Sequence, residues 1–165
     1  MVQVDADTSS LAYTGTDLDW FIKTFTISLD GTSITEVASL QQEAPREGYK
    51  CIVQVDADTY ALAGTGENGD GYIATFTISA DGTSITEVAS CEHDGINGEY
   101  NSLVQVDSDT YALAYSGTDD DGFIKTFTIQ SDGSMGSTVI SGNAGFRMMS
   151  SPLAGQIYSD LLNEL

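Results

Sequence analysis

Short runs of β-branched and aromatic residues alternate along the chain with turns rich in Gly and Asp. In the middle third of the chain these runs cover residues 51–55, 60–63, 72–78 and 84–89. Runs of this length between Gly/Asp segments are typical of β-strands. An Asp-Gly pair precedes the fourth run and recurs at Asp30-Gly31, Asp81-Gly82 and Asp132-Gly133, as expected for hairpin turns. The pattern therefore predicts four antiparallel strands in each unit.

The same pattern occurs three times. VQVDADT begins at Val2 and at Val53, and VQVDSDT begins at Val104, so the period is 51 residues. The third copy departs from the others after Asp132. Units this small bury a core only by stacking on their neighbours. We expect three tandem units at 1–49, 50–100 and 101–141, followed by a tail at 142–165.

The second strand of each unit predicts a sheet that is apolar on both faces. In the third copy Tyr111, Leu113 and Tyr115 point to one face, while Ala112 and Ala114 point to the other. Such a sheet has to be covered on both sides, and the alanines allow a neighbouring sheet to approach closely. Four strands in a repeat of 40–50 residues are typical of a β-propeller blade, whereas an immunoglobulin-like sandwich needs about seven.

In this strand and turn pattern, residues 1–141 resemble the β-propeller superfamily, without the signatures that would assign a subfamily. The resemblance implies that the first strand of each repeat lines a central axis. Because propellers have four to eight blades, three blades leave a ring open. We expect a homodimer in which blade three of each chain packs on blade one of the other to close a six-bladed ring. A monomer capped by its tail and a larger ring are the alternatives.

The tail has a different character. Gly145-Phe146-Arg147 followed by two methionines and Ser150-Ser151-Pro152, and then the stretch Tyr158–Leu162, resemble the opening of a module in large secreted bacterial surface proteins. The resemblance implies a polypeptide that continues past Leu165 and is exported to the cell surface or the medium, although no signal peptide precedes the first strand. The spacing of the apolar residues from 158 to 165 predicts a short amphipathic helix.

The charge excludes some partners. Five Lys and Arg residues face 25 Asp and Glu residues, for a net charge of −20. Such a surface repels nucleic acids and anionic membranes. No stretch is apolar for long enough to span a bilayer. The simplest interpretation is solubility in a salty medium, with the binding of ions or cationic ligands as the alternative.

Metal and thiol chemistry have weak signals. Asp119, Asp120 and Asp121 cluster in one turn and could form a weak Ca²⁺ site, although Asp also occurs in turns for conformational reasons. We expect no other cofactor. Cys51 and Cys91 stand at unrelated positions of the repeat, which indicates free thiols.

The loops at one end of the blades carry the candidate ligand-binding residues. An aromatic ring supplies contact area and Asp or Asn supplies direction, which suits a carbohydrate or a protein ligand. Trp20 stands where the other repeats have Gly71 and Gly122, and His93 is the only histidine. The predicted ligand-binding residues are Trp20, Arg46, Tyr49, His93, Asp94, Asn97, Tyr100 and Asn101.

Three functions remain open at this point. The preferred one is a non-enzymatic binding or scaffold module of an exported acidic repeat protein, because no nucleophile stands beside the single histidine. The second is a hydrolase or lyase with carboxylates on the propeller axis, such as Glu43, Glu47, Asp94 and Glu99. The third is a purely structural spacer.

Overall fold

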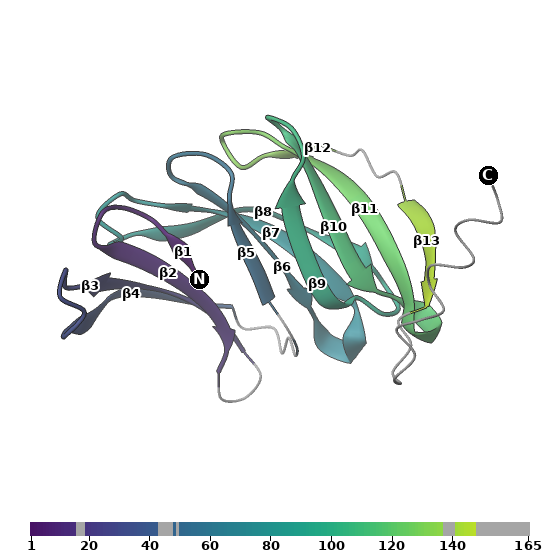
Figure 1. The fold of residues 1–165 in the computed structure, drawn as a ribbon, viewed down its shortest axis with the longest axis horizontal. Helices are drawn as coiled ribbons and strands as arrows, with labels where there is room; N and C mark the ends of the chain where they lie inside the picture. Colours follow the sequence, from purple (N-terminus) through teal and green to yellow (C-terminus); the bar gives the residue numbers. More distant parts are fainter. Residues whose placement is uncertain (16–18, 43–47, 49, 137–140, 148–165) are drawn as a thin grey trace.

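The protein is an all-β stack of three antiparallel sheets, one for each repeat. The computed structural model describes residues 1–15, 19–42, 48, 50–136 and 141–147. In Figure 1 the sheets lie side by side in chain order, from the purple first sheet to the green and yellow third sheet. No helix in the described part of the chain is long and apolar enough to cross a membrane. The predicted all-β class and the four strands per repeat are confirmed.

The second sheet shows the arrangement in full. Its strands are β5 (Lys50–Gln54), β6 (Thr59–Thr65), β7 (Gly71–Ile78) and β8 (Ile85–Asp94), paired in that order. The turn between β7 and β8 carries the predicted Asp-Gly pair. There Gly82 adopts φ +70°, and the Asp81 carboxylate accepts bonds from the side chains of Ser79 and Thr83. The sequence DG therefore sets the hairpin through both backbone freedom and side-chain bonds.

The first sheet repeats this order. It consists of β1 (Val2–Gln3), β2 (Thr8–Thr14), β3 (Trp20–Ile27) and β4 (Ile34–Gln42). Its register is the same as in the second sheet, because Ile22 pairs with Ala12 just as Ile73 pairs with Ala63.

The third sheet has an interrupted fourth strand. It contains β9 (Glu99–Gln105), β10 (Thr110–Ser116) and β11 (Asp121–Ile129), and both β12 (Met135–Gly136) and β13 (Ser141–Arg147) pair with β11. The pairing of β13 follows that of β8, since Phe123 opposite Asn143 matches Tyr72 opposite Glu92. The expected boundary after residue 141 thus falls inside a strand, and the predicted helix lies outside the described residues.

The core consists of two layers, one between each pair of neighbouring sheets. Residues 60–63 of β6 are all 0 % exposed, so the second sheet is covered on both faces. The outer sheets bury one face each: in β10, Tyr111, Leu113 and Tyr115 are buried while Ala114 is exposed. In β6 the second sheet presents Tyr60 and Leu62 to the first sheet, and Ala61 and Ala63 to the third. Every sheet therefore has a bulky face and a small face, as the alternation in the sequence predicts.

The same hydrogen bond joins neighbouring sheets at both layers. Thr24 Oγ1 donates to the Gly82 carbonyl at 2.6 Å, and Thr75 Oγ1 donates to the Gly133 carbonyl at 2.6 Å. Both threonines are fully buried, so each bond satisfies a hydroxyl that water does not reach. The third strand of one sheet is thereby fixed to the hairpin turn of the next.

One large side chain fills the end of each layer, but from opposite sides. In the first layer Trp20 is 1 % exposed and lies against Gly64 of the second sheet. A Cβ atom at position 64 would stand 2.7 Å from Trp20 Cζ2. In the third sheet the residue equivalent to Gly64 is Tyr115, which reaches back over the second sheet to His93 beside Gly71, the equivalent of Trp20. Each layer therefore combines a large side chain of one sheet with a glycine of the neighbouring sheet, in direct contact in the first layer and with His93 between them in the second.

We expect Gly64→Ala to lower the free energy of unfolding by about 1–3 kcal/mol, because the added methyl group overpacks the Trp20 ring. In a Trp20→Leu background the same substitution should cost much less. Urea unfolding of the four proteins of this double-mutant cycle measures the difference. Equal costs in both backgrounds would contradict the proposed contact.

Candidate ligand-binding site

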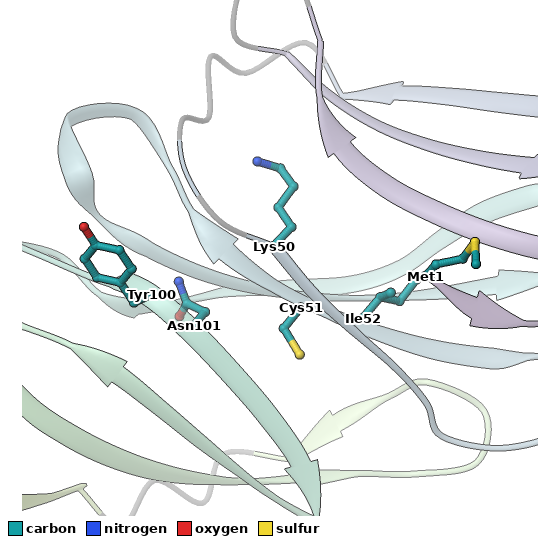
Figure 2. A pocket seen from close by; sticks show the side chains of 6 residues that line it. All are labelled: Met1, Lys50, Cys51, Ile52, Tyr100 and Asn101. Carbon is teal, nitrogen blue, oxygen red and sulfur yellow. The ribbon is translucent and has the colours of Figure 1, made fainter.

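An open pocket lies where the first strands of the three sheets come together. It has a volume of about 460 Å³ and is lined from β5, from the start of β9 and from the N-terminus (Figure 2). Cys51 helps to hold β5 against β9, since its Sγ accepts a hydrogen bond from the Leu103 backbone at 3.4 Å. The lining residues are Met1, Lys50, Cys51, Ile52, Tyr100 and Asn101.

Tyr100 gives this pocket its most exposed aromatic surface. Its side chain is 52 % exposed and its φ is +51°, a left-handed conformation that is unfavourable for a bulky residue. Left-handed non-glycine residues gather at functional sites, where the surrounding structure has to hold them. The left-handed conformation coincides with an irregularity in the sheet. Ala114 of β10 pairs with Ser102, but Ser116 pairs with Glu99, so the register of β9 against β10 shifts at Tyr100.

The first linker joins β4 to β5, and the second linker joins β8 to β9. Both make equivalent hydrogen bonds, but the residues that form them are spaced differently. Thr14 Oγ1 donates to the Gly48 carbonyl at 3.4 Å, and the equivalent Thr65 Oγ1 donates to the Gly98 carbonyl at 2.9 Å. The next polar side chain bonds back to the same carbonyl: Lys50 in the first linker and Asn101 in the second. The two linkers are equally long, but the bonded glycine stands two residues before Lys50 and three before Asn101. The left-handed turn at Tyr100 lies within this longer step from the glycine to the strand.

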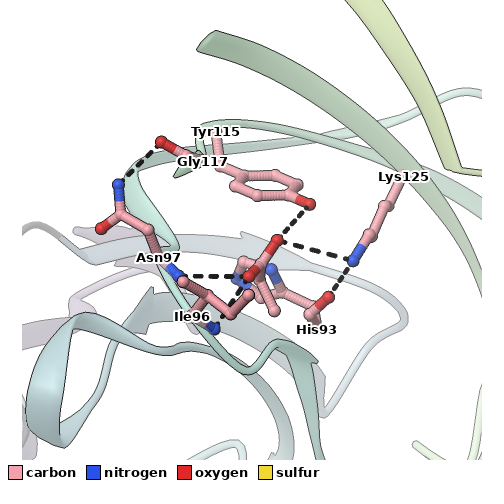
Figure 3. A network of polar contacts seen from close by, with 7 residues as sticks. His93, Ile96, Asn97, Tyr115, Gly117 and Lys125 are labelled. Carbon is pink, nitrogen blue, oxygen red and sulfur yellow. Dashed lines mark hydrogen bonds and ion pairs between the residues drawn. The ribbon is translucent and has the colours of Figure 1, made fainter. Parts of the chain in front are cut away.

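A polar network fastens the second linker between the second and third sheets (Figure 3). The Asp94 carboxylate accepts bonds from the backbone N–H groups of Ile96 and Asn97 and from the Tyr115 hydroxyl at 3.0 Å. Lys125 Nζ lies 3.9 Å from the same carboxylate. Burial alone would raise the pKa of Asp94, but these bonds and the lysine outweigh it and lower that pKa.

His93 lies at the centre of this network and is 5 % exposed. Burial, and then the positive charge of Lys125, lower the pKa of His93 to about 4, although Asn101 and Asp94 favour protonation. Neither ring nitrogen has a hydrogen-bond partner within the described residues. The imidazole is therefore neutral at physiological pH, and its ring packs at 4.7 Å from that of Tyr115. Lys125 Nζ also donates to the His93 carbonyl.

The structure separates the predicted ligand-binding residues into groups. Asn101 and Tyr100 line the pocket, while His93, Asp94 and Asn97 belong to the polar network. Trp20 is buried between the first two sheets, with Lys50 Nζ 4.6 Å from its ring centroid. Arg46 and Tyr49 lie outside the described residues.

Three contributors were missed at the level of sequence: Lys50, Tyr115 and Lys125. All three stand at positions where the repeats differ: Tyr115 and Lys125 match Tyr13 and Lys23 of the first repeat, whereas the second repeat departs with Gly64 and Ala74. Lys50 aligns with Asn101. Such departures were a usable signal. Only the packing of β11 against the second linker shows that Lys125 reaches Asp94.

The acidic turn at residues 119–121 has a conformational explanation. Asp119 and Asp120 adopt φ +63° and +60°, in a 3₁₀ turn over Thr118–Asp120 that matches the turn at Asn68 and Gly69. No three His, Cys, Asp or Glu side chains of the described residues converge closely enough to hold a metal ion. Asp119 and Asp120 are exposed and Asp121 is half-buried, which fits a turn at the surface.

No protein-family model matches the chain, and its sequence has no match among curated proteins. The site is therefore interpreted from its own geometry.

Replacing His93 by Gln, the residue at the equivalent position 42, should change the pH dependence of stability. The unfolded state takes up a proton near pH 6.5 and the folded state near pH 4, so wild-type stability falls as pH drops through this window. We expect the variant to lack this loss, which amounts to roughly 1–3 kcal/mol. Urea unfolding of both proteins at several pH values between about 4 and 7 measures it. Parallel curves would show that His93 titrates normally.

We expect Asp120→Gly to raise the melting temperature by about 2–4 °C, because glycine adopts the left-handed conformation without strain. The converse change, Gly69→Asp, should lower it by a similar amount. Thermal unfolding with and without CaCl₂ separates the alternatives. Wild-type stabilisation by calcium that Asp120→Gly abolishes would identify a calcium site instead of a conformational turn.

Proposed function

We propose that the three sheets are consecutive blades of a β-propeller, and that the chain is half of a six-bladed ring completed by a homodimer. The meander order of each sheet, the face-to-face packing and the shared edge of β1, β5 and β9 support this arrangement. The pocket then faces the propeller axis, because the first strands line it.

The proposed role is that of a non-enzymatic binding or scaffold module of an exported, acidic repeat protein. The observation that carries it is Tyr100, an exposed aromatic ring held at the pocket by a left-handed backbone. Beside it, the polar side chains of Asn101 and Lys50 line the pocket, and each is held in place by a hydrogen bond to a linker carbonyl. An aromatic ring provides apolar contact area, and neighbouring polar groups fix the orientation of a ligand. This combination suits a sugar or a peptide.

The charge of the protein narrows the ligand class. A net charge of −20 repels anions and attracts cations over the whole surface. We therefore favour neutral oligosaccharides or basic peptides over acidic ligands.

The enzymatic alternative has less support. A general acid in a hydrolase or lyase needs a carboxyl group whose pKa is raised. The pKa of Asp94 is instead lowered, and the Asp94 carboxylate is fully engaged with the linker and the third sheet. Glu43 and Glu47 lie outside the described residues.

A pair of Tyr100 variants tests the binding role. Tyr100→Asn removes the ring and keeps a residue that tolerates the left-handed conformation, whereas Tyr100→Phe keeps the ring. The probes are an array of neutral oligosaccharides and a library of Lys/Arg-rich peptides. We expect Tyr100→Asn to weaken binding of the retained probe by about tenfold or more, and Tyr100→Phe by about threefold at most.

The other outcomes are equally informative. Equal binding by wild type and Tyr100→Asn would place the site elsewhere. Cleavage of an arrayed sugar would favour the enzyme, and binding of neither probe set would favour the structural spacer. Ile96→Ala is the matched control, since Ile96 is 72 % exposed in the same linker but does not line the pocket.

A further inference from the structure

The two ends of the stack expose complementary halves of the same interface. The threonine that bonds to the next sheet is Thr24 in the first sheet and Thr75 in the second. The equivalent residue of the third sheet is Thr126, and the equivalent turn of the first sheet is Gly31. Within the described residues neither makes this bond, and a Cβ atom built on Gly31 meets nothing within 4 Å.

Exposed apolar residues mark these two end faces. Val104, Val106 and Ile124 of the third sheet are 57 %, 64 % and 43 % exposed, while the equivalent Val53, Val55 and Ile73 pack into the layer between the second and third sheets. At the other end, Met1 and Ile34 are 75 % and 68 % exposed, while their equivalents Ile52 and Ile85 pack between the first and second sheets. These five make up most of the nine exposed large hydrophobic residues described, so the exposure is concentrated where a further sheet would pack.

The shapes of the end faces also match. The third sheet ends on its small face, with Ala112, Ala114 and Ile124, and the first sheet ends on its bulky face, with Leu11, Phe25 and Ile27. Inside the stack a small face always meets a bulky face. The two end faces are thus opposite in kind, and two copies of either face would not match each other.

The residues that fill the end of the second layer also have counterparts on the two free end faces. Inside the stack Tyr115 packs on His93, which fills the space at Gly71, and the positions of Gly71 and Tyr115 are occupied at the free ends by Gly122 and Tyr13. Tyr13 stacks on Phe21 at 5.5 Å, just as Tyr115 stacks on Phe123 at 5.5 Å. Tyr13 of one copy would therefore lie over the end of the third sheet of another that carries Gly122, as Tyr115 lies over the end of the second sheet that carries Gly71 and His93.

We infer that the bulky face of the first sheet binds the small face of the third sheet of a second copy, head to tail, with Thr126 donating to the Gly31 carbonyl across the contact. The same contact made twice closes a ring of two chains. The inference rests on the propeller arrangement proposed above. Its test is separate from ligand binding, because Tyr100 belongs to neither face.

Light scattering during size-exclusion chromatography tests the inference on the full chain. We expect twice the chain mass of 17.5 kDa, with tighter association at about 0.5 M NaCl, where repulsion between acidic chains is screened. A monomer at both salt concentrations would overturn the inference and indicate that another segment, such as residues 148–165, covers a face. A mass that grows steadily with protein concentration would overturn ring closure.

Charged substitutions on each face test whether the contact joins the bulky face of one copy to the small face of the other. Ile124→Arg blocks the small face and Ile34→Arg blocks the bulky face, and both positions are exposed enough to leave the fold intact, which circular dichroism checks. We expect each variant alone to be a monomer, and an equal mixture to form a two-chain species, because one intact pair of faces remains. Ile96→Arg, outside both faces, should keep the wild-type mass.

A two-chain mass for Ile124→Arg alone, or two folded variants that do not associate when mixed, would overturn the head-to-tail contact. Thr126→Val probes the hydrogen bond itself, and we expect it to weaken dimerisation by about three- to tenfold. An unchanged dissociation constant would exclude this bond from the interface.

Discussion

The structure depends on the packing of a bulky sheet face against a small one. In the second sheet, for example, Tyr60 and Leu62 of β6 lie on one face while Ala61 and Ala63 lie on the other. Neighbouring sheets therefore pack with the bulky face of one against the small face of the next. Buried threonine hydroxyls then fix the third strand of one sheet to the hairpin turn of the next. Because the unit repeats, the rule that joins the sheets also defines what the two ends of the stack are able to bind.

Departures from the repeat occur where sheets and linkers meet. Trp20 fills the first layer against Gly64, and Tyr115 fills the second layer against His93, which stands beside Gly71. The polar network around Asp94 and Lys125 is present at the second linker, which ends with the left-handed Tyr100 at the pocket. The individual character of the protein therefore lies in the linkers and in the strand positions that face them, while the rest of the strands carry the shared architecture.

Much of the fold followed from the sequence because its signals are local. Two-residue alternation indicated the strands and their faces, and Asp-Gly indicated the turns. The candidate site was predicted only in part. Asn97, Tyr100 and Asn101 were recognised as polar and aromatic loop residues, but Trp20 proved to be buried between sheets, and Lys125 comes from a strand distant in sequence. Burial depends on what packs above a residue, which local sequence does not contain.

The sequence by itself determined the period, the strands, the two kinds of sheet face and the acidic surface, because each depends on residue type and spacing alone. The tertiary structure decided which large residue fills each layer, which carboxylate meets Lys125, and that Tyr100 adopts a left-handed conformation beside a shift in strand register. It also decided which apolar residues stay exposed. The reason is physical: these properties arise from contacts between segments tens of residues apart, and chain geometry there is set by the packing of whole sheets.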